Sequence, residues 1–309
     1  MRDLEASNRR MTELLRDLTT GEGTRPSILE GVTLMRTDRP IPRMPVLYEP
    51  GIVIVGQGQK RGYLGDKVYT YDPHNYLVLS VPMPFECEAE IDPNGPFLAV
   101  AIRIEVAVLG ELLMKMDRRP PANGEYQPSG MFSTPLDLAL SEATVRLLES
   151  LTSPVDARVL GPQIMREITY RVLCGEHGGS LRALIALNGH LHQIQRSLDR
   201  MHASYSTALD VASLAESAGM SVSAFHHSFK AVTATSPLQY LKTIRLHKAR
   251  MFMVQEGMGA SSAAVRVGYE STSQFSREFK RFFGATPLDE AARVRTVLGL
   301  ESSAVARIE

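Results

Sequence analysis

The chain has 309 residues, 44% of them hydrophobic, which is enough for two ordinary globular domains, and its formal net charge is zero. Its two cysteines, Cys87 and Cys174, are too few for a disulfide framework, and the residues around them do not form a zinc-binding motif. No apolar run reaches about 18 residues, and the charged first 20 residues lack the apolar centre of a signal peptide, so we expect a cytoplasmic protein without a transmembrane helix.

The N-terminal part begins with a short amphipathic helix over residues 1–20, followed by a loose connection at 21–25. From residue 31 to residue 105 the pattern changes to short strands. The runs 51–56 and 76–81 are apolar or β-branched and are bounded by turn residues. Several strands at this spacing predict a small barrel or sandwich. The strongest turn signals are at 65–66, 72–75 and 92–96.

Helical patterns return after the predicted strands. Residues 134–137 predict a capping box that opens a helix with one apolar face. Residues 153–154 predict the start of another helix, which is kinked or restarted at Pro162. The glycine-rich segment 175–180 is the best linker candidate, and residues from about 181 to 209 predict helix.

Residues 221–238 and 271–288 repeat one pattern fifty positions apart, with seven identities in eighteen positions. A short alanine-rich stretch and a glycine, Gly219 or Gly268, precede each copy. A short helix, a glycine turn and a second helix make a helix-turn-helix, whose second helix can read the major groove of DNA.

Each copy has an N-cap serine and an apolar stripe. Ser221 and Ser271 lie where an N-cap oxygen would accept from free backbone N–H groups, and Gln274 completes a capping box in the second copy. Apolar side chains recur at i, i+4 and i+7, so we expect one face of the second helix to turn inward. These residues are Phe225, Phe229 and Val232 in the first copy and Phe275, Phe279 and Phe282 in the second.

The remaining positions are predicted to point outward with side chains that suit base edges and phosphates. The alternative is a plain helical core with a solvated outer face, and the presence of two copies in register favours the DNA-binding interpretation. The predicted contacts in the first copy are Ser221, Ser223, His226, His227 and Lys230. Those in the second copy are Ser271, Ser273, Gln274, Ser276, Arg277, Lys280 and Arg281.

Charge is distributed unevenly along the chain. Residues 196–295 carry 13 Lys and Arg against 8 Asp and Glu, a net charge of +5, whereas residues 1–195 carry 20 against 24, a net charge of −4. A basic C-terminal half on an acidic N-terminal half fits DNA binding confined to one domain.

The C-terminal motifs closely resemble those of the AraC/XylS family of bacterial transcription regulators. The match departs at Ala234, where the family often has glycine and the second copy has Gly284; alanine costs little there unless the turn needs a positive φ. Arg245 belongs to the matching positions and joins the predicted DNA contacts. The matches in the second copy are 263–264, 267–269, 271, 274–284 and 286–287, and those in the first are 214–215, 219–221, 225, 229–230, 236–237, 240, 245–246 and 249–250.

The N-terminal half resembles the cupin-like domain of one AraC-type subgroup, through residues 48–50, 56–61, 69–73, 76–77 and 80–82. This resemblance implies a small β-barrel, a helical dimerisation region and a pocket for an inducer. The alternative for each expected pocket residue is simple core packing, because strand facing is uncertain by one residue. The expected wall consists of Tyr48, Val53, Val55, Tyr69, Tyr71, Leu77, Leu79 and Phe85.

Other chemistry has weaker support. A cupin enzyme needs three or four convergent metal ligands, but His74 is the only histidine between residues 31 and 105, so we expect no metal and no cofactor. Cys87 would serve as a redox sensor only if its thiol were reactive, and its flanking residues Glu86 and Glu88 would raise its pKa. His226 and His227 could also indicate a pH switch or a metal site, but an outward contact with a base or phosphate is the simpler interpretation.

The sequence thus predicts an α+β multidomain regulator rather than an enzyme. We expect a cupin-like sensing and dimerisation domain over 1–176, a linker over 177–193, a DNA-binding domain with two helix-turn-helix motifs over 194–296 and a tail over 297–309. Its expected partners are duplex DNA, a small-molecule effector and a second copy of the chain, with RNA polymerase as a further candidate. The alternative is a metal-dependent cupin enzyme with an appended DNA-binding module, which would hold metal and turn over a substrate.

Overall fold

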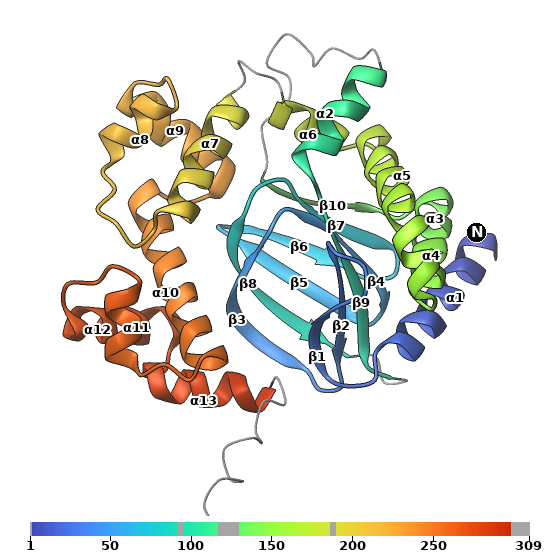
Figure 1. Ribbon diagram of the computed structural model, residues 1–309, viewed down its shortest axis with the longest axis horizontal. Coiled ribbons are helices and arrows are strands. Elements are labelled where there is room, and N and C mark those ends of the chain that lie inside the picture. Colours follow the sequence, from blue (N-terminus) through green and yellow to red (C-terminus); the bar gives the residue numbers. More distant parts are fainter. Residues whose placement is uncertain (1, 92–94, 117–129, 186–189, 298–309) are drawn as a thin grey trace, which may run out of the picture.

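The structure is a computed structural model that describes residues 2–91, 95–116, 130–185 and 190–297 (Figure 1). Its N-terminal half combines antiparallel sheets with helices, and its C-terminal half is all helical, which confirms the predicted α+β class. Within the described residues, no helix is long and apolar enough to cross a membrane. The expected tail lies almost wholly outside the described residues.

The strands form two antiparallel sheets that face each other. Contact between the sheets is direct, because the Lys60 Nζ lies 4.7 Å from the centroid of the Phe97 ring across the interior. The six-stranded sheet has the order β1 (Gly23–Pro26), β2 (Val32–Thr37), β9 (Phe97–Arg103), β4 (Gly51–Gln57), β7 (Asn75–Leu79) and β10 (Met131–Pro135). The four-stranded sheet has the order β3 (Ile41–Tyr48), β8 (Met83–Glu90), β5 (Gln59–Leu64) and β6 (Lys67–Tyr71).

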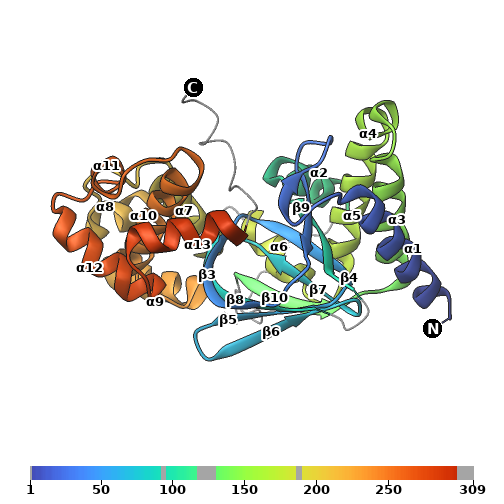
Figure 2. The same cartoon turned by 90° about the horizontal axis from the view of Figure 1, so that it is seen from below.

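Helices cover the outer face of the six-stranded sheet, and the C-terminal region lies on the opposite side of the barrel (Figures 1 and 2). The covering helices include α1 (Arg2–Leu18), α3 (Leu138–Ser150) and α5 (Gly161–Cys174). At Gly56 a side chain would lie 2.8 Å from Leu15, so glycine permits α1 to approach the sheet. Because both faces of β4 are covered, this strand is a continuous apolar run rather than an alternating one.

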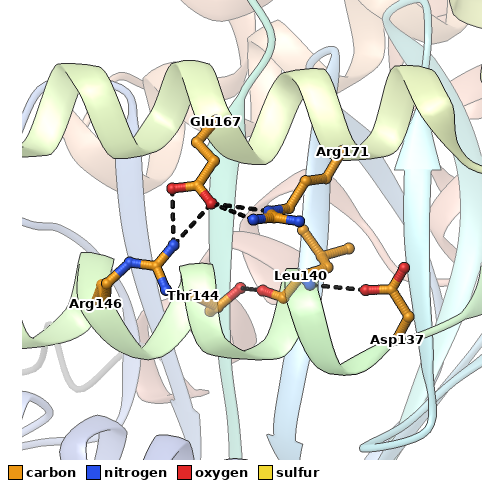
Figure 3. A network of polar contacts seen from close by, with 6 residues as sticks. All are labelled: Asp137, Leu140, Thr144, Arg146, Glu167 and Arg171. Carbon is orange, nitrogen blue, oxygen red and sulfur yellow. Dashed lines mark hydrogen bonds and ion pairs between the residues drawn. The ribbon is translucent and has the colours of Figure 1, made fainter.

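An ion-pair network ties α3 to α5 on the outside of this layer (Figure 3). Glu167 accepts hydrogen bonds from Arg146 of α3 at 2.7 Å and from the Arg171 Nε at 2.9 Å. Asp137 caps α3 by accepting from the Leu140 N–H at 2.7 Å. The partners are partly exposed, so the network fixes the pairing of the helices more than it stabilises the fold.

The sequence-based elements are partly confirmed and partly wrong in this half. The helix over 1–20 and the restart at Pro162 are confirmed, the latter by the break between α4 (Pro154–Val159) and α5. The predicted capping box at 134–137 is wrong. Thr134 lies in β10, where it pairs with Tyr76 of β7, and the N-cap of α3 is Asp137. Three elements were not predicted: β1, which falls in the expected loose connection, β10 and α2 (Val106–Lys115).

The glycine-rich segment expected as a linker is not an open connection. Helix α6 (Gly178–Ile185) begins inside it, and a side chain at Gly178 would lie 2.0 Å from the Leu173 carbonyl oxygen. Helix α7 (His190–Ala203) begins after four residues outside the described part. Of the span predicted as helix, 181–209, the described residues 181–185 and 190–203 are helical.

The C-terminal region is built around the long helix α10 (Pro237–Gln255). Its first half packs Tyr240 and Ile244 into the core shared with Phe229, and its second half packs Leu246 and Ala249 into the core shared with Phe279. The other helices are α8 (Val211–Ser217), α9 (Val222–Thr233), α11 (Ala260–Arg266), α12 (Thr272–Phe283) and α13 (Pro287–Val297).

Candidate functional site

Two helix-turn-helix units, α8 with α9 and α11 with α12, have the same turn geometry. The turn glycines have positive φ, +67° at Gly219 and +86° at Gly268. In each unit the residue after the glycine donates its N–H back to an alanine carbonyl at 3.0 Å. At Gly268 a Cβ would also lie 2.2 Å from the Ser206 carbonyl oxygen, so this position needs glycine for conformation and for space.

The predicted N-caps are confirmed in both units. The Ser221 Oγ accepts from the Ala224 N–H at 3.3 Å, and the Ser271 Oγ accepts from the Gln274 N–H at 3.2 Å. The reciprocal half of the predicted capping box is absent, because the Gln274 amide donates to the Glu278 Oε1 at 3.1 Å instead. Glu278 also accepts from Lys242 and Tyr269, so these three side chains hold it in place.

The predicted apolar stripes are buried with one exception. Phe225 and Phe229 in α9, like Phe275 and Phe279 in α12, are fully buried. Phe282 is only half-buried, and the adjacent Phe283 takes the inward place expected for it. The Phe282 ring instead lies edge-on to His247, 5.4 Å between centroids, at the boundary with the N-terminal half.

The outer surfaces of α9 and α12 are where the sequence places the DNA contacts. Among the described residues, no hydrogen bond or ion pair holds the Arg277 and Lys280 side chains, so both are available to a ligand. The Ser276 hydroxyl, by contrast, donates to the Thr272 carbonyl at 2.9 Å. All twelve predicted positions on these two units are exposed: Ser221, Ser223, His226, His227, Lys230, Ser271, Ser273, Gln274, Ser276, Arg277, Lys280 and Arg281.

Two predicted contacts are placed differently from the rest. Arg245 donates to the Tyr205 carbonyl at 2.6 Å and to the Thr207 carbonyl at 2.8 Å, so its guanidinium is committed to the preceding loop. These two hydrogen bonds give Arg245 a structural role in holding the loop, and its contact with DNA stays a prediction. Arg281 lines a cavity of about 410 Å³ between the two halves, together with Arg43 and Glu86.

The helix C-caps distinguish the two copies. Ala234 ends α9 with φ at +58°, and Gly284 ends α12 with φ at +79°. The turn after α9 therefore does need a positive φ, which is the condition under which alanine is costly.

We expect Ala234→Gly to stabilise the protein by about 1 kcal/mol and Gly284→Ala to destabilise it by about 1–2 kcal/mol. A Cβ at Gly284 would meet no atom within 4 Å, so that loss would report backbone strain alone. Urea unfolding of both variants measures the two effects. Shifts of the same sign would contradict the assignment.

All eight residues predicted for the pocket face the space between the sheets. In the six-stranded sheet Val53 is opposite Leu77 and Ala101, on the same face as Phe97. In the four-stranded sheet the facing positions carry Tyr69, Tyr71 and Phe85, and the Tyr48 ring contacts Phe85 edge-on at 5.0 Å. A cavity of about 410 Å³ opens at one end of this interior, and Tyr48, Val53 and Leu79 belong to its wall.

The surroundings of His74 and Cys87 do not indicate metal or redox chemistry. His74 is exposed in a turn, where its N–H donates to Asp72, and no three His, Cys, Asp or Glu side chains converge within the described residues. Burial, rather than the flanking carboxylates, is the main cause that raises the pKa of the Cys87 thiol. Glu86 and Glu88 point to the opposite face of β8 and pair with arginines there.

The helical half docks on strands β3 and β8 of the barrel. The Tyr240 hydroxyl donates to the Pro82 carbonyl at 2.7 Å, and Arg250 donates to the Pro45 carbonyl at 3.3 Å. A Cβ at Gly130 would lie 2.6 Å from the Val232 carbonyl oxygen, so the end of α9 also touches the barrel. Helix α10 therefore contacts both helix-turn-helix units and the N-terminal half.

The geometry defines a two-part protein with paired helix-turn-helix units on a small β-barrel. Family models agree: residues 28–180 match the AraC-type transcriptional regulator N-terminus, and residues 214–293 match a helix-turn-helix domain. The chain belongs to the AraC family of transcriptional regulators, a family of regulators and not of enzymes.

Individual relatives share this organisation to different extents. The raffinose operon regulator RafR of Pediococcus pentosaceus is 30% identical over 217 residues, 68% of this chain and 73% of its own. The activator RclR of Escherichia coli K12 is 40% identical over 88 residues, 28% of this chain, and the match spans only 31% of RclR. ToxT of Vibrio cholerae, solved with an unsaturated fatty acid bound, has the same fold with a TM-score of 0.57 and 11% identity, over 88% of this chain and 97% of its own.

Proposed function

We propose that this protein binds operator DNA with both helix-turn-helix units and that a small molecule in the barrel controls this binding. The observation that carries the DNA part is the repeated surface: α9 and α12 have nearly the same order of buried and exposed positions. In this proposal residues 194–296 bind DNA, and residues 1–176 sense the effector and pair with a second copy of the chain.

In this proposal the two recognition helices α9 and α12 bind DNA together, as one rigid unit. Helix α10 has 19 residues, which corresponds to a length of about 28 Å at 1.5 Å per residue. Because its two halves pack into the cores of the two units, the distance between α9 and α12 is fixed. Their contacts should therefore fall in successive major grooves on one face of the duplex.

A footprint of the full-length protein on its operator should show two protected patches per bound chain, about 10–10.5 bp apart. The rigid α10 is the physical reason for this spacing. Hydroxyl-radical cleavage of genomic targets measures it, and the targets themselves would name the regulated genes. One patch, or two patches out of helical phase, would contradict the model.

The effector part of the proposal rests on the barrel interior. Small barrels are either filled with side chains or hold one small ligand, and a cavity of about 410 Å³ is within the usual range of ligand sites. Its wall is mostly apolar, so we infer a mostly apolar small molecule. The same fold holds a fatty acid in ToxT.

A short path joins this cavity to the DNA-binding half. Tyr48 in the cavity wall is the strand partner of Met83, and the neighbouring Pro82 carbonyl accepts the Tyr240 hydroxyl of α10. A ligand that moves Tyr48 would therefore act on the docking of α10 and shift a pre-existing equilibrium between arrangements of the DNA-binding half.

Thermal shift and DNA titration of the same compounds test this control. A compound that raises the melting temperature of the protein but leaves its DNA affinity unchanged would indicate that the barrel is a dimerisation scaffold and not a sensor.

A further inference from the structure

The side-chain amide of Gln274 is held at one end, by a carboxylate of its own helix. Its nitrogen donates to the Glu278 Oε1 at 3.1 Å, one turn further along α12. Gln274 is exposed, whereas the side chain of Glu278 is only 13% exposed. Within the described part of the chain, the amide oxygen of Gln274 accepts no hydrogen bond, so it is available to a ligand.

Glu278 is itself fixed by side chains from two other segments. The Lys242 Nζ of α10 donates to its Oε1 at 3.0 Å, and the Tyr269 hydroxyl, from the turn before α12, donates to its Oε2 at 2.9 Å. Tyr269 is buried, and its ring lies edge-on to Phe275 with 5.3 Å between the centroids. The carboxylate therefore has a fixed place relative to the core of the second helix-turn-helix unit.

The ionisation state of Glu278 decides which way the amide faces. Burial alone would raise the pKa of Glu278, but the hydrogen bonds from Gln274, Lys242 and Tyr269 lower that pKa below its ordinary value, so the group is ionised at physiological pH. An ionised carboxylate only accepts hydrogen bonds, so it holds the amide nitrogen and repels the amide oxygen. A flipped amide would set two oxygen atoms against each other.

We propose that Glu278 is a positioning residue that makes Gln274 select adenine in the major groove; this rests on the proposed function of α12 as a DNA-binding helix. With its nitrogen held by Glu278, the amide presents its oxygen together with its second N–H. Adenine offers the complement, an N6 amino donor beside the N7 acceptor. Guanine offers two acceptors, and its O6 would face the amide oxygen. The fixed amide therefore binds adenine and rejects guanine.

The first helix-turn-helix unit lacks this pair of side chains. Fifty positions earlier, α9 has Ala224 and Ser228 where α12 has Gln274 and Glu278. An alanine methyl group makes no hydrogen bond to a base edge, so the adenine preference belongs to the second unit alone. The two DNA contacts of one bound chain should therefore differ at this place.

The test uses the full-length protein and the operator sequence that it selects from randomised duplexes. Gln274→Ala identifies the base pair that this side chain contacts, as the position where the base preference disappears. At that position the original protein should prefer adenine over guanine at least about tenfold. Two analogues of this adenine should each weaken binding severalfold: 7-deazaadenine, which lacks the N7 acceptor, and purine, which lacks the N6 amino group.

Glu278→Gln separates positioning from contact with the base. The neutral amide that it introduces can donate as well as accept, so Gln274 is free to turn over and its preference for adenine over guanine should fall severalfold. Affinity for unrelated duplexes should not fall, because the substitution removes a negative charge near DNA. Glu270→Gln removes an exposed carboxylate from the turn before α12 and is the matched control, which should keep the adenine preference.

Tyr269→Phe keeps the test open if Glu278→Gln folds poorly. This variant retains the ring against Phe275 and the charge of Glu278, but it removes one hydrogen bond that anchors the carboxylate. The adenine preference should fall by a smaller factor than in Glu278→Gln, and thermal unfolding shows whether each variant is folded.

Three results would overturn this inference: an adenine preference that survives Glu278→Gln, equal weakening of all sequences in that variant, or full affinity for both adenine analogues. A specific operator that is read by Arg277 but not by Gln274 would leave the regulator intact and remove only the role of Glu278. If the protein bound no duplex sequence specifically, the proposed function would fail and this inference with it.

Discussion

Glu290→Ala should destabilise the second helix-turn-helix unit by about 3–5 kcal/mol, the usual effect of removing one partner of a buried ion pair. Glu290 is fully buried and accepts from Arg250 at 3.1 Å and from Arg293 at 2.8 Å. Burial lowers the pKa of Arg250 and Glu290 opposes this effect, so the substitution would leave a buried guanidinium without its anion.

The matched control for this experiment is Glu256→Ala. Glu256 also pairs with an arginine, Arg266, but both side chains are 46% exposed, so this loss should stay below about 1 kcal/mol. Thermal and urea unfolding measure the totals, and hydrogen exchange should locate the Glu290 effect in α10 and α13. If the two variants lost equal stability, burial of the Glu290 pair would not be the cause.

Arg277→Ala should cost about 1–3 kcal/mol of binding free energy on the cognate operator and should relax the preference at one base pair. Arg277 is exposed on the outer face of α12 and is unpaired among the described residues, so its planar guanidinium can contact a guanine edge with two hydrogen bonds. Titrations against operator variants with single base changes measure the loss and show which position is read.

Lys280→Ala, on the same helix, separates base reading from phosphate contact. It should weaken all sequences alike and flatten the dependence of log affinity on log salt by about one unit, since a lost phosphate contact releases fewer counterions. A uniform, sequence-independent loss in both variants would assign Arg277 to the backbone instead.

Local sequence signals predicted the helix-turn-helix units well because their determinants are local. The Ser221 and Ser271 caps and the turn glycines act over four or five residues, so their spacing alone indicates the structure. The inward facing of Val53 and Leu77 was likewise readable, since alternation along a strand leaves only two choices.

The misplaced elements depend on distant partners. Thr134 suits an N-cap by its local sequence, but pairing with Tyr76, 58 positions earlier, places it in a strand. The sequence around Arg245 indicates an unpaired cation, because its partner, the carbonyl of Tyr205, lies 40 positions earlier in the chain. The burial of Lys60 could not be read from the polar run 57–61, because only the second sheet closes the barrel around it.

Helix α10 carries both recognition units and also makes the contacts to the barrel, through Tyr240 and Arg250. A tilt of α10 against β3 and β8 would therefore move α9 and α12 together and keep their spacing. Effector and operator would then act on one shared equilibrium, and thermodynamic linkage makes the coupling mutual. Whatever factor the effector imposes on DNA affinity, the operator imposes on effector affinity, so copies bound at promoters would respond at a different effector concentration from free copies.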